Sequence, residues 1–310
     1  MKRVLSLCLM GLLLLIPMTS RADTAVGDSI AILGEDLTDA QREALLAEFG
    51  VEEDTLILTI TNKEEHETLG NIVPSGKIGS KAISSAMITY TEKGSGLDIT
   101  TSEHITYITK QNYADALITA GITDAKIQIS APYDVSGTAA LTGIMKAYET
   151  SSGATIDPEV KEAVNEEVLL SVTIGDELAS QAEKSGQDTE TAKNEAQKKA
   201  SDIVSDIKVT ISEQKPETRE QIETIVTDTL QRYEVSLSDE TYAKLVSLFD
   251  KMRTLDIDWD TVASNIKNKA NQVMDTVTDF VNSEEGQGFL NTLKGWFERF
   301  LDWLKGLFSL

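Results

Sequence analysis

Apolar and polar residues follow two different rhythms along this chain, and the rhythm changes near residue 152. Before that point, short apolar runs typical of strands are interleaved with stretches in which apolar residues recur every three or four positions, as in helices. From Ile156 onward the strand pattern fades and helical spacing continues. The pattern predicts an α+β fold, with a mixed helix and strand domain over residues 23–152 and a mainly helical region over residues 153–283.

The first domain is predicted to alternate between strands and helices. The strands over 83–91 and 97–101 are expected to form a hairpin, because the glycine-containing segment Lys93-Gly94-Ser95-Gly96 separates them. The other expected strands cover residues 29–33, 55–61 and 126–130. Helices are expected to begin at Thr38, Asn62, Thr109 or Gln111, and Gly137.

Two of these helical segments resemble each other. When Thr38 is aligned with Thr109, Gly50 falls on Gly121, so that each segment consists of a helix, a glycine and a strand. Two interpretations stay open: a pseudo-symmetric domain with a cleft between its halves, or a common local way of ending a helix. In the later region, helices with an apolar stripe are expected to begin at Pro216, at Ser238 or Asp239, and at Asp260.

The first 22 residues have the pattern of a signal peptide. Lys2 and Arg3 precede an apolar run that ends near Met18, and the small-residue site Ser20-Arg21-Ala22 follows. The run is shorter than the roughly 20 apolar residues that a membrane-spanning helix needs. Cys8 lies inside the run, where no lipid-modified cysteine would stand, and the chain has no other cysteine. We therefore expect a secreted, extracytoplasmic protein without disulfide bonds.

The net charge of −23 makes some partners improbable. Nucleic acid, anionic lipid head groups and acidic wall polymers would be repelled, whereas divalent cations or a cationic partner would be attracted. Acidity also keeps secreted proteins in solution without any specific ligand. The charge predicts no nucleic-acid partner and no cofactor, apart from the option of a divalent cation. The oligomeric state is left open.

Three aspartates form a candidate metal site. Asp256, Asp258 and Asp260 are spaced like the start of a calcium-binding EF-hand loop, but Thr261 stands where the sharp turn needs glycine and Lys267 where a bidentate glutamate is required. Capping of a helix by Asp260 is the alternative interpretation.

The two histidines, His66 and His104, are the candidate catalytic residues. They lie in different expected elements, so the sequence shows no histidine pair with zinc-ligand spacing. Either could act as the base for a nearby serine or threonine nucleophile, because catalytic triads assemble in space and not in sequence.

The C-terminus carries the strongest amphipathic pattern. After a break over residues 284–288, residues 289–310 place their apolar side chains at intervals of three and four. The charges between them allow an interfacial helix but no spanning one. This helix would contact a membrane surface or a partner, or it would pack on the preceding helices or on its copy in a dimer. The candidate contact residues are Phe289, Leu293, Trp296, Phe297, Phe300, Trp303, Leu304 and Leu307.

Five runs of residues together resemble one protein family. The runs are Leu33-Gly34-Glu35-Asp36-Leu37-Thr38, Phe49-Gly50-Val51, Leu69-Gly70-Asn71-Ile72-Val73-Pro74, Ile78-Gly79-Ser80-Lys81-Ala82-Ile83-Ser84-Ser85 and Ala131-Pro132-Tyr133-Asp134-Val135-Ser136-Gly137-Thr138-Ala139-Ala140-Leu141-Thr142-Gly143-Ile144. On these runs the chain is similar to the YpuA-like secreted family of Gram-positive bacteria, a domain of unknown function (1002). The resemblance implies export from a Gram-positive cell and implies no reaction, catalytic residue or cofactor.

Within the last run, Ser136, Gly137 and Thr138 are the candidate binding residues. They lie between a strand and a helix, and exposed amides at a helix start bind anionic groups. Alternatively, Ser136 and Thr138 only cap that helix. The sequence thus favours a non-enzymatic interaction module associated with the cell envelope, whose partner is an envelope protein or the membrane surface. The alternatives are an extracytoplasmic hydrolase that acts on wall or peptide substrates, and a secreted protein that binds divalent cations.

Overall fold

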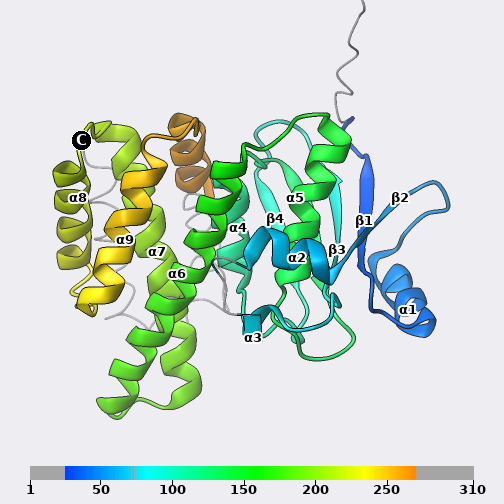
Figure 1. Ribbon diagram of the computed structural model, residues 1–310, viewed down its shortest axis with the longest axis horizontal. Coiled ribbons are helices and arrows are strands. Elements are labelled where there is room, and N and C mark those ends of the chain that lie inside the picture. Colours follow the sequence, from blue (N-terminus) through cyan, green and yellow to red (C-terminus); the bar gives the residue numbers. More distant parts are fainter. Residues whose placement is uncertain (1–24, 71, 73–74, 270–310) are drawn as a thin grey trace, which may run out of the picture. The chain divides into compact units, whose positions relative to one another are not determined.

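The structure is a computed structural model that describes residues 25–70, 72 and 75–269 (Figure 1). These residues form two compact units. The first unit contains the described residues up to Lys110 together with Asp124–Asn165, and the second contains Gln111–Thr123 together with the described residues from Glu166 onward. The chain therefore passes between the units three times, and the first unit runs on to Asn165 instead of ending at residue 152.

The first unit is built on a mixed sheet of five strands. The strands are β1 (Ser29–Gly34), β2 (Leu56–Ile60), β3 (Ser85–Tyr90), β4 (Leu97–Thr101) and β5 (Ala125–Ser130). They lie in the order β2-β1-β3-β5-β4. β1 is parallel to β2 and β4 is parallel to β5, whereas β3 is antiparallel to both of its neighbours. With the helical second unit described below, this sheet confirms the predicted α+β class.

The expected hairpin between residues 83–91 and 97–101 was wrong. β5 lies between β3 and β4, and its residue Ile127 is paired with Ile88 on one side and Ile99 on the other. All three isoleucines are buried, so β5 takes an inner position that its apolar residues require. The glycine segment is instead held by the carboxylate of Asp124, which accepts hydrogen bonds from the amides of Gly94 (2.8 Å) and Gly96 (3.0 Å).

Helices α1 (Asp39–Phe49) and α5 (Thr138–Ser152) cover the two faces of this sheet. α2 (Asn62–Leu69) packs against α5 and against α3 (Ser75–Ile78). Leu33 of β1 belongs to the cluster around α1, and its neighbour Ile32 faces α5, because successive strand residues point to opposite faces. Gly143 lets α5 approach β1 closely, since a Cβ atom there would lie 2.4 Å from Cγ2 of Ile32. This contact fixes the position of α5, whose first turn borders the site described below.

The helix starts agree with the sequence in part. Thr38 caps α1 as expected, in a capping box with Gln41. α2 begins at Asn62 as expected, but the residue that caps it is Thr61, so the Asn62 side chain makes other contacts. In the second unit, α8 (Arg219–Arg232) is capped by Thr218 and begins after Pro216.

The two similar segments both connect parallel strands. Gly50 and Gly121 have φ of +68° and +83°, and in both segments the amides of the glycine and of the next residue bond back to the helix. The first segment's helix is α1 of the first unit, whereas the helix of the second, α4 (Lys110–Thr119), lies almost entirely in the second unit. The two segments therefore resemble each other in the local connection between a helix and the strand that follows it.

The second unit is mainly helical in its described residues. Besides α4 and α8 it contains most of α6 (Pro158–Lys184), α7 (Thr189–Gln214), α9 (Asp239–Met252) and a helical segment over residues 259–269. Most residues of the apolar stripes expected for α8 and α9 are buried, Ile222 and Phe249 completely. None of the helices in the described ranges has the length and apolar character that a membrane crossing requires.

Candidate functional site

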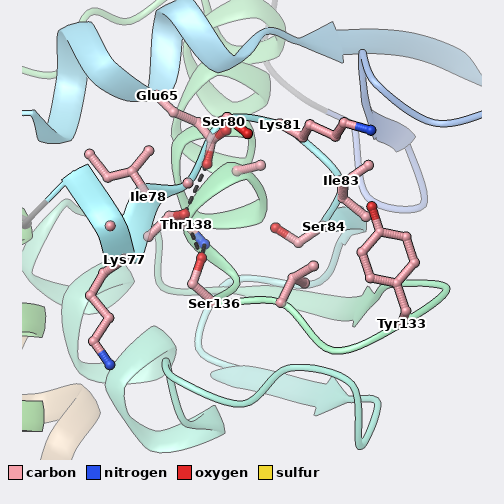
Figure 2. A pocket seen from close by; sticks show the side chains of 14 residues that line it. Glu65, Lys77, Ile78, Ser80, Lys81, Ile83, Ser84, Tyr133, Ser136 and Thr138 are labelled. Carbon is pink, nitrogen blue, oxygen red and sulfur yellow. Dashed lines mark hydrogen bonds between the residues drawn. The ribbon is translucent and has the colours of Figure 1, made fainter.

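A pocket of about 300 Å³ opens beside the start of α5 in the first unit (Figure 2). Segments that are far apart in the sequence line it. α2 contributes Glu65, residues 76–81 come from α3 and the loop after it, and residues 83–84 come from the approach to β3. Tyr133, Val135, Ser136, Thr138 and Ala139 complete the lining from the loop before α5 and its first turn. The structure thus places the candidate residues Ser136 and Thr138 in a pocket.

The first turn of α5 is capped from outside the helix. Its N-cap residue, Gly137, has φ of +96°, a conformation that favours glycine, and has no side chain to accept the first amides. Oγ of Ser84, which precedes β3, instead accepts a hydrogen bond from the amide of Ala140 (3.0 Å). Ser136 only makes a long contact of 3.5 Å with the amide of Thr138. Capping therefore does not account for the hydroxyl of Thr138.

The hydroxyl of Thr138 is bound to a buried carboxyl group. Thr138 Oγ1 donates to Oε1 of Glu65 (2.9 Å), and Nδ2 of Asn62 donates to Oε2 (3.3 Å). Glu65 is only 1% exposed. Burial raises the pKa of Glu65 to about 7, although both hydrogen bonds oppose the rise. This carboxyl group therefore gains or loses its proton near neutral pH.

Ser136 extends this pair into a chain of three hydrogen-bonding groups. Its Oγ lies 2.8 Å from Oγ1 of Thr138, as Figure 2 shows. While Glu65 is ionised it can only accept, so Thr138 donates to it and Ser136 donates to Thr138. When Glu65 is protonated on Oε1 it can donate to Thr138, Thr138 can then donate to Ser136, and the proton of Ser136 is free for a ligand. The proton on Glu65 thus decides what Ser136 offers to the pocket.

The other charged residues of the lining are two lysines. Lys77 and Lys81 stand on opposite sides of the pocket in Figure 2. The ammonium group of Lys77 lies 4.8 Å from the ring centroid of Tyr107, which holds it by a cation–π contact. The chain as a whole is acidic, with a net charge of −23, whereas this pocket contains two lysines and one carboxyl group whose pKa is raised. Its charge suits an anionic ligand.

The two histidines lie outside the lining of this pocket and make separate contacts. Nε2 of His66 lies 2.9 Å from the carbonyl oxygen of Gly79. Nδ1 of His104 lies 2.7 Å from Oδ1 of Asp134, and both side chains are exposed, by 39% and 74%. Neither histidine has a hydrogen bond to a hydroxyl group in the described part of the chain. The geometry gives no serine or threonine nucleophile paired with either of them.

The three candidate metal-ligating aspartates do not converge. Asp258 caps the helical segment 259–269, since its carboxylate accepts hydrogen bonds from the amide (3.0 Å) and the hydroxyl (2.7 Å) of Thr261. Asp260, the expected cap, instead accepts a hydrogen bond from Ser212 (3.0 Å). Within residues 25–269, apart from the gaps, no group of three or more histidine, cysteine, aspartate or glutamate side chains is arranged to bind a metal ion.

A second cluster of charged groups lies in the core of the second unit. Nζ of Lys208 donates to Oε1 of Glu167 (2.7 Å), to Oγ1 of Thr119 (3.1 Å) and to the carbonyl oxygen of Asp115 (3.1 Å). Ser201 donates to the carboxylate of Asp115. Burial raises the pKa of Glu167, and Lys208 opposes the rise. Because all of these residues are buried, the cluster joins α4, α6 and α7 and offers no access to a substrate.

The sequence interpretation missed Glu65. Nothing in the composition of α2 distinguishes it from Glu64 and Glu67, the other acidic residues of that helix. A signal was nevertheless present, because Leu69 lies one helical turn further on and is buried. A helix oriented by Leu69 points Glu65 inward as well.

The candidate contact residues of the C-terminal segment, from Phe289 to Leu307, lie outside the described residues, as do the signal peptide and the linker over residues 284–288.

Comparison with known proteins places the chain among uncharacterised relatives. A family model described as "Protein of unknown function (DUF1002)" matches residues 33–269. The "Uncharacterized protein YpuA" of Bacillus subtilis (strain 168) is 39% identical over 287 residues, which cover 92% of this chain and 91% of that protein. No solved structure matches. Both matches confirm the resemblance seen in the sequence, and neither name states an activity.

Proposed function

We propose that this chain, which belongs to the DUF1002 family of proteins of unknown function, is an exported, non-enzymatic binding module. Its pocket at the start of α5 would hold a small anionic ligand rich in hydroxyl groups. The observation that carries this proposal is the hydrogen-bonded chain from Ser136 through Thr138 to Glu65.

The composition of the pocket supports this class of ligand. Lys77 and Lys81 attract an anion, and the first turn of α5 adds the positive end of a helix dipole. Hydroxyl side chains supply both donors and acceptors, which suits a ligand with several hydroxyl groups of its own. These side chains are Ser80, Ser84, Tyr133, Ser136 and Thr138.

Binding of an anion would be coupled to a proton. An anionic group in the pocket disfavours the ionised form of Glu65, so the bound complex keeps the proton to a higher pH than the free protein does. A protonated Glu65 also frees the hydroxyl of Ser136 to donate to the ligand. Affinity is therefore expected to fall as the pH rises through the pKa of Glu65, which is about 7.

A binding role accounts for this pocket better than hydrolysis does. The lining contains no histidine, and its carboxyl group is buried and bonded to Thr138 and Asn62. The cation-binding alternative has no support from the described aspartates.

The place of action is proposed from the sequence. Residues 1–22 would supply the signal for export. The segment over residues 289–310 would then retain the protein at the outer face of the cell membrane or on an envelope protein.

The test is a titration of the full mature chain with glucuronate and with glucose 6-phosphate, with neutral glucose as the comparison, followed by amide NMR and calorimetry. Both anionic sugars should shift the amide signals of residues 136–140, and glucose should not. The dissociation constant of glucuronate, whose own carboxylate stays ionised, should rise about tenfold between pH 6 and pH 8, which is the effect of one proton with a pKa near 7. The E65Q variant should bind glucuronate with an affinity that does not change over this range.

The control compares two lysine substitutions. Lys81→Ala should weaken binding of both anionic sugars, whereas Lys63→Ala, at a position 82% exposed on α2 and outside the pocket lining, should leave it unchanged. Equal effects of the two substitutions, or amide shifts elsewhere than at the pocket, would contradict the proposal.

A further inference from the structure

The outer edge of the sheet at β2 has an unusual composition. β2 is the last strand on its side, and in the described part of the chain only β1 pairs with it. Its sequence, Leu-Ile-Leu-Thr-Ile, contains no charged residue. Leu56 and Ile57 are 47% and 38% exposed. Proteins normally protect such edges with charges, prolines or bulges, because an apolar edge strand pairs readily with another chain.

The register shows which backbone groups of β2 face outward. The carbonyl oxygen of Ile60 accepts a hydrogen bond from the amide of Glu35, which follows β1, so Ile60 bonds toward β1. In a parallel pair, alternate residues bond to the same neighbour, so Leu56 and Leu58 also face β1. The backbone groups of the intervening residues, Ile57 and Thr59, therefore point away from the sheet.

One half of this edge is closed and the other is open. At the closed half, Nζ of Lys146 donates to the outward carbonyl oxygen of Thr59 (2.9 Å). The amide of Thr61, two residues further along the chain, donates to Oε2 of Glu64 (2.8 Å). No comparable side chain covers the backbone of Ile57 among the described residues. The open half thus consists of Ile57 and the amide of Thr59, flanked by the exposed side chain of Leu56.

The surroundings of the open half are strongly acidic. Residues 25–61 contain nine acidic residues and one basic residue, Arg42. A second pocket, of about 470 Å³, lies at this end of β2, and its lining includes the acidic residues Asp28, Glu52 and Asp54 and the apolar residue Leu56. A basic side chain with an apolar stem fits that combination. A second copy of this chain would bring the same charge and be repelled.

We infer that the open half of β2 is a docking edge for an extended, cationic segment of another protein, which adds to the sheet as a strand beside Ile57 and places a basic side chain in the acidic pocket. Main-chain hydrogen bonds to Ile57 supply affinity, and the carboxylates select the charge of the partner.

The experiment measures binding of a synthetic seven-residue peptide that alternates lysine and valine, with both ends blocked, to the full mature chain. Amide NMR should show shifts at Ile57 and Thr59. A peptide that alternates glutamate and valine should not bind, and one with the lysines and valines in separate blocks should bind at least tenfold more weakly, because it cannot place its side chains alternately on the two faces of a strand.

Two variants test the two parts of the inference. Ile57→Pro removes the outward amide without removing a bond to β1, and should weaken binding at least tenfold. The double variant E52Q and D54N should weaken it severalfold and should not disturb the fold, because neither carboxylate has a side-chain bond to the described residues. The matched control, E43Q with E48Q, removes two charges from exposed positions of α1 and should bind within about twofold of the wild type.

Three results would overturn the inference. One is equal binding by the wild type and by both edge variants. Another is self-association through β2, seen as a dimer in sedimentation that Ile57→Pro dissolves. The third is that the peptide binds only after residues 270–310 are removed, which would mean that the chain itself occupies this edge.

Discussion

Two adjacent glutamates on α2 show how strongly the position of a single residue decides its chemistry. Burial acts against the ionised form of Glu64, but hydrogen bonds from Lys146 and Thr61 prevail and lower its pKa. At Glu65 burial prevails and raises the pKa to about 7. The same residue type therefore serves as an anion at one position and as a proton carrier at the next.

Substitution of Glu65 by glutamine should change the pH dependence of stability. The pKa of Glu65 rises from its ordinary value of 4.5 to about 7 on folding, so the folded protein holds the proton more tightly than the unfolded chain does. The wild type should therefore lose stability as the pH rises from 4.5 to 7, by an amount on the order of 3 kcal/mol. E65Q cannot ionise, and urea unfolding should find it more stable than the wild type at pH 8 and nearly equal at pH 4.5.

The neighbouring substitution is the control for this measurement. The pKa of Glu64 is lowered, so its stabilising effect is present at neutral pH and is lost as the pH falls. E64Q should therefore destabilise the protein at pH 8. A gain in stability at pH 8 for both variants would contradict this account.

At the scale of elements, one buried ion pair connects three helices of the second unit. Lys208 of α7 bonds to Glu167 of α6 and to Thr119 of α4, so a single ammonium group links three helices. Such a pair contributes little net stability compared with apolar packing, but the loss of one partner leaves a buried charge without compensation. The cluster therefore selects one arrangement of these helices.

Replacement of Lys208 by methionine should destabilise the chain by about 3–5 kcal/mol in urea unfolding, because it leaves Glu167 buried and unpaired. The double variant K208M with E167L should recover most of that loss. Lys244→Met, in a pair with Glu240 on α9 whose side chains are 59% and 77% exposed, should cost less than about 1 kcal/mol. Equal losses for K208M and K244M would show that the buried cluster is dispensable.

Sequence patterns predicted where helices and strands occur better than which strands and side chains contact one another. The apolar spacing of α8 and α9 and the glycine at the end of α1 were sufficient, because those signals are local. The pairing of β4 with β5 was missed, because β3 and β4 follow each other in the sequence and no local signal indicates that Ile127 of β5 lies between them. For the same reason Ser136 and Thr138 could be named from the sequence, whereas Glu65 joins them across more than 70 residues.

At the scale of the whole molecule, the net charge and the proposed export together predict where the protein can act. A net charge of −23 keeps most of its surface away from anionic lipids and wall polymers. The C-terminal segment over residues 289–310 is the part whose aromatic and apolar side chains are spaced for an interface. Retention at the cell is therefore expected to depend on that segment alone.

A chain that ends at Gly288 should appear in the culture medium, whereas the full chain should stay with the envelope fraction. Immunoblotting of the two fractions measures this, and washing with high salt separates apolar from ionic attachment. If the shortened and full chains distribute alike, the segment does not hold the protein at the cell surface.

The three passages of the chain between its two units affect how the protein withstands proteolytic cleavage. A single cut between Asn165 and Glu166 would leave the units still joined through the segment Gln111–Thr123, which is entered from the first unit and returns to it. A cut on either side of that segment would likewise leave two connections intact. Separation of the units by peptide-bond cleavage requires three cuts, so a molecule cut once at a connection between the units keeps its pocket and its β2 edge in one covalently joined molecule.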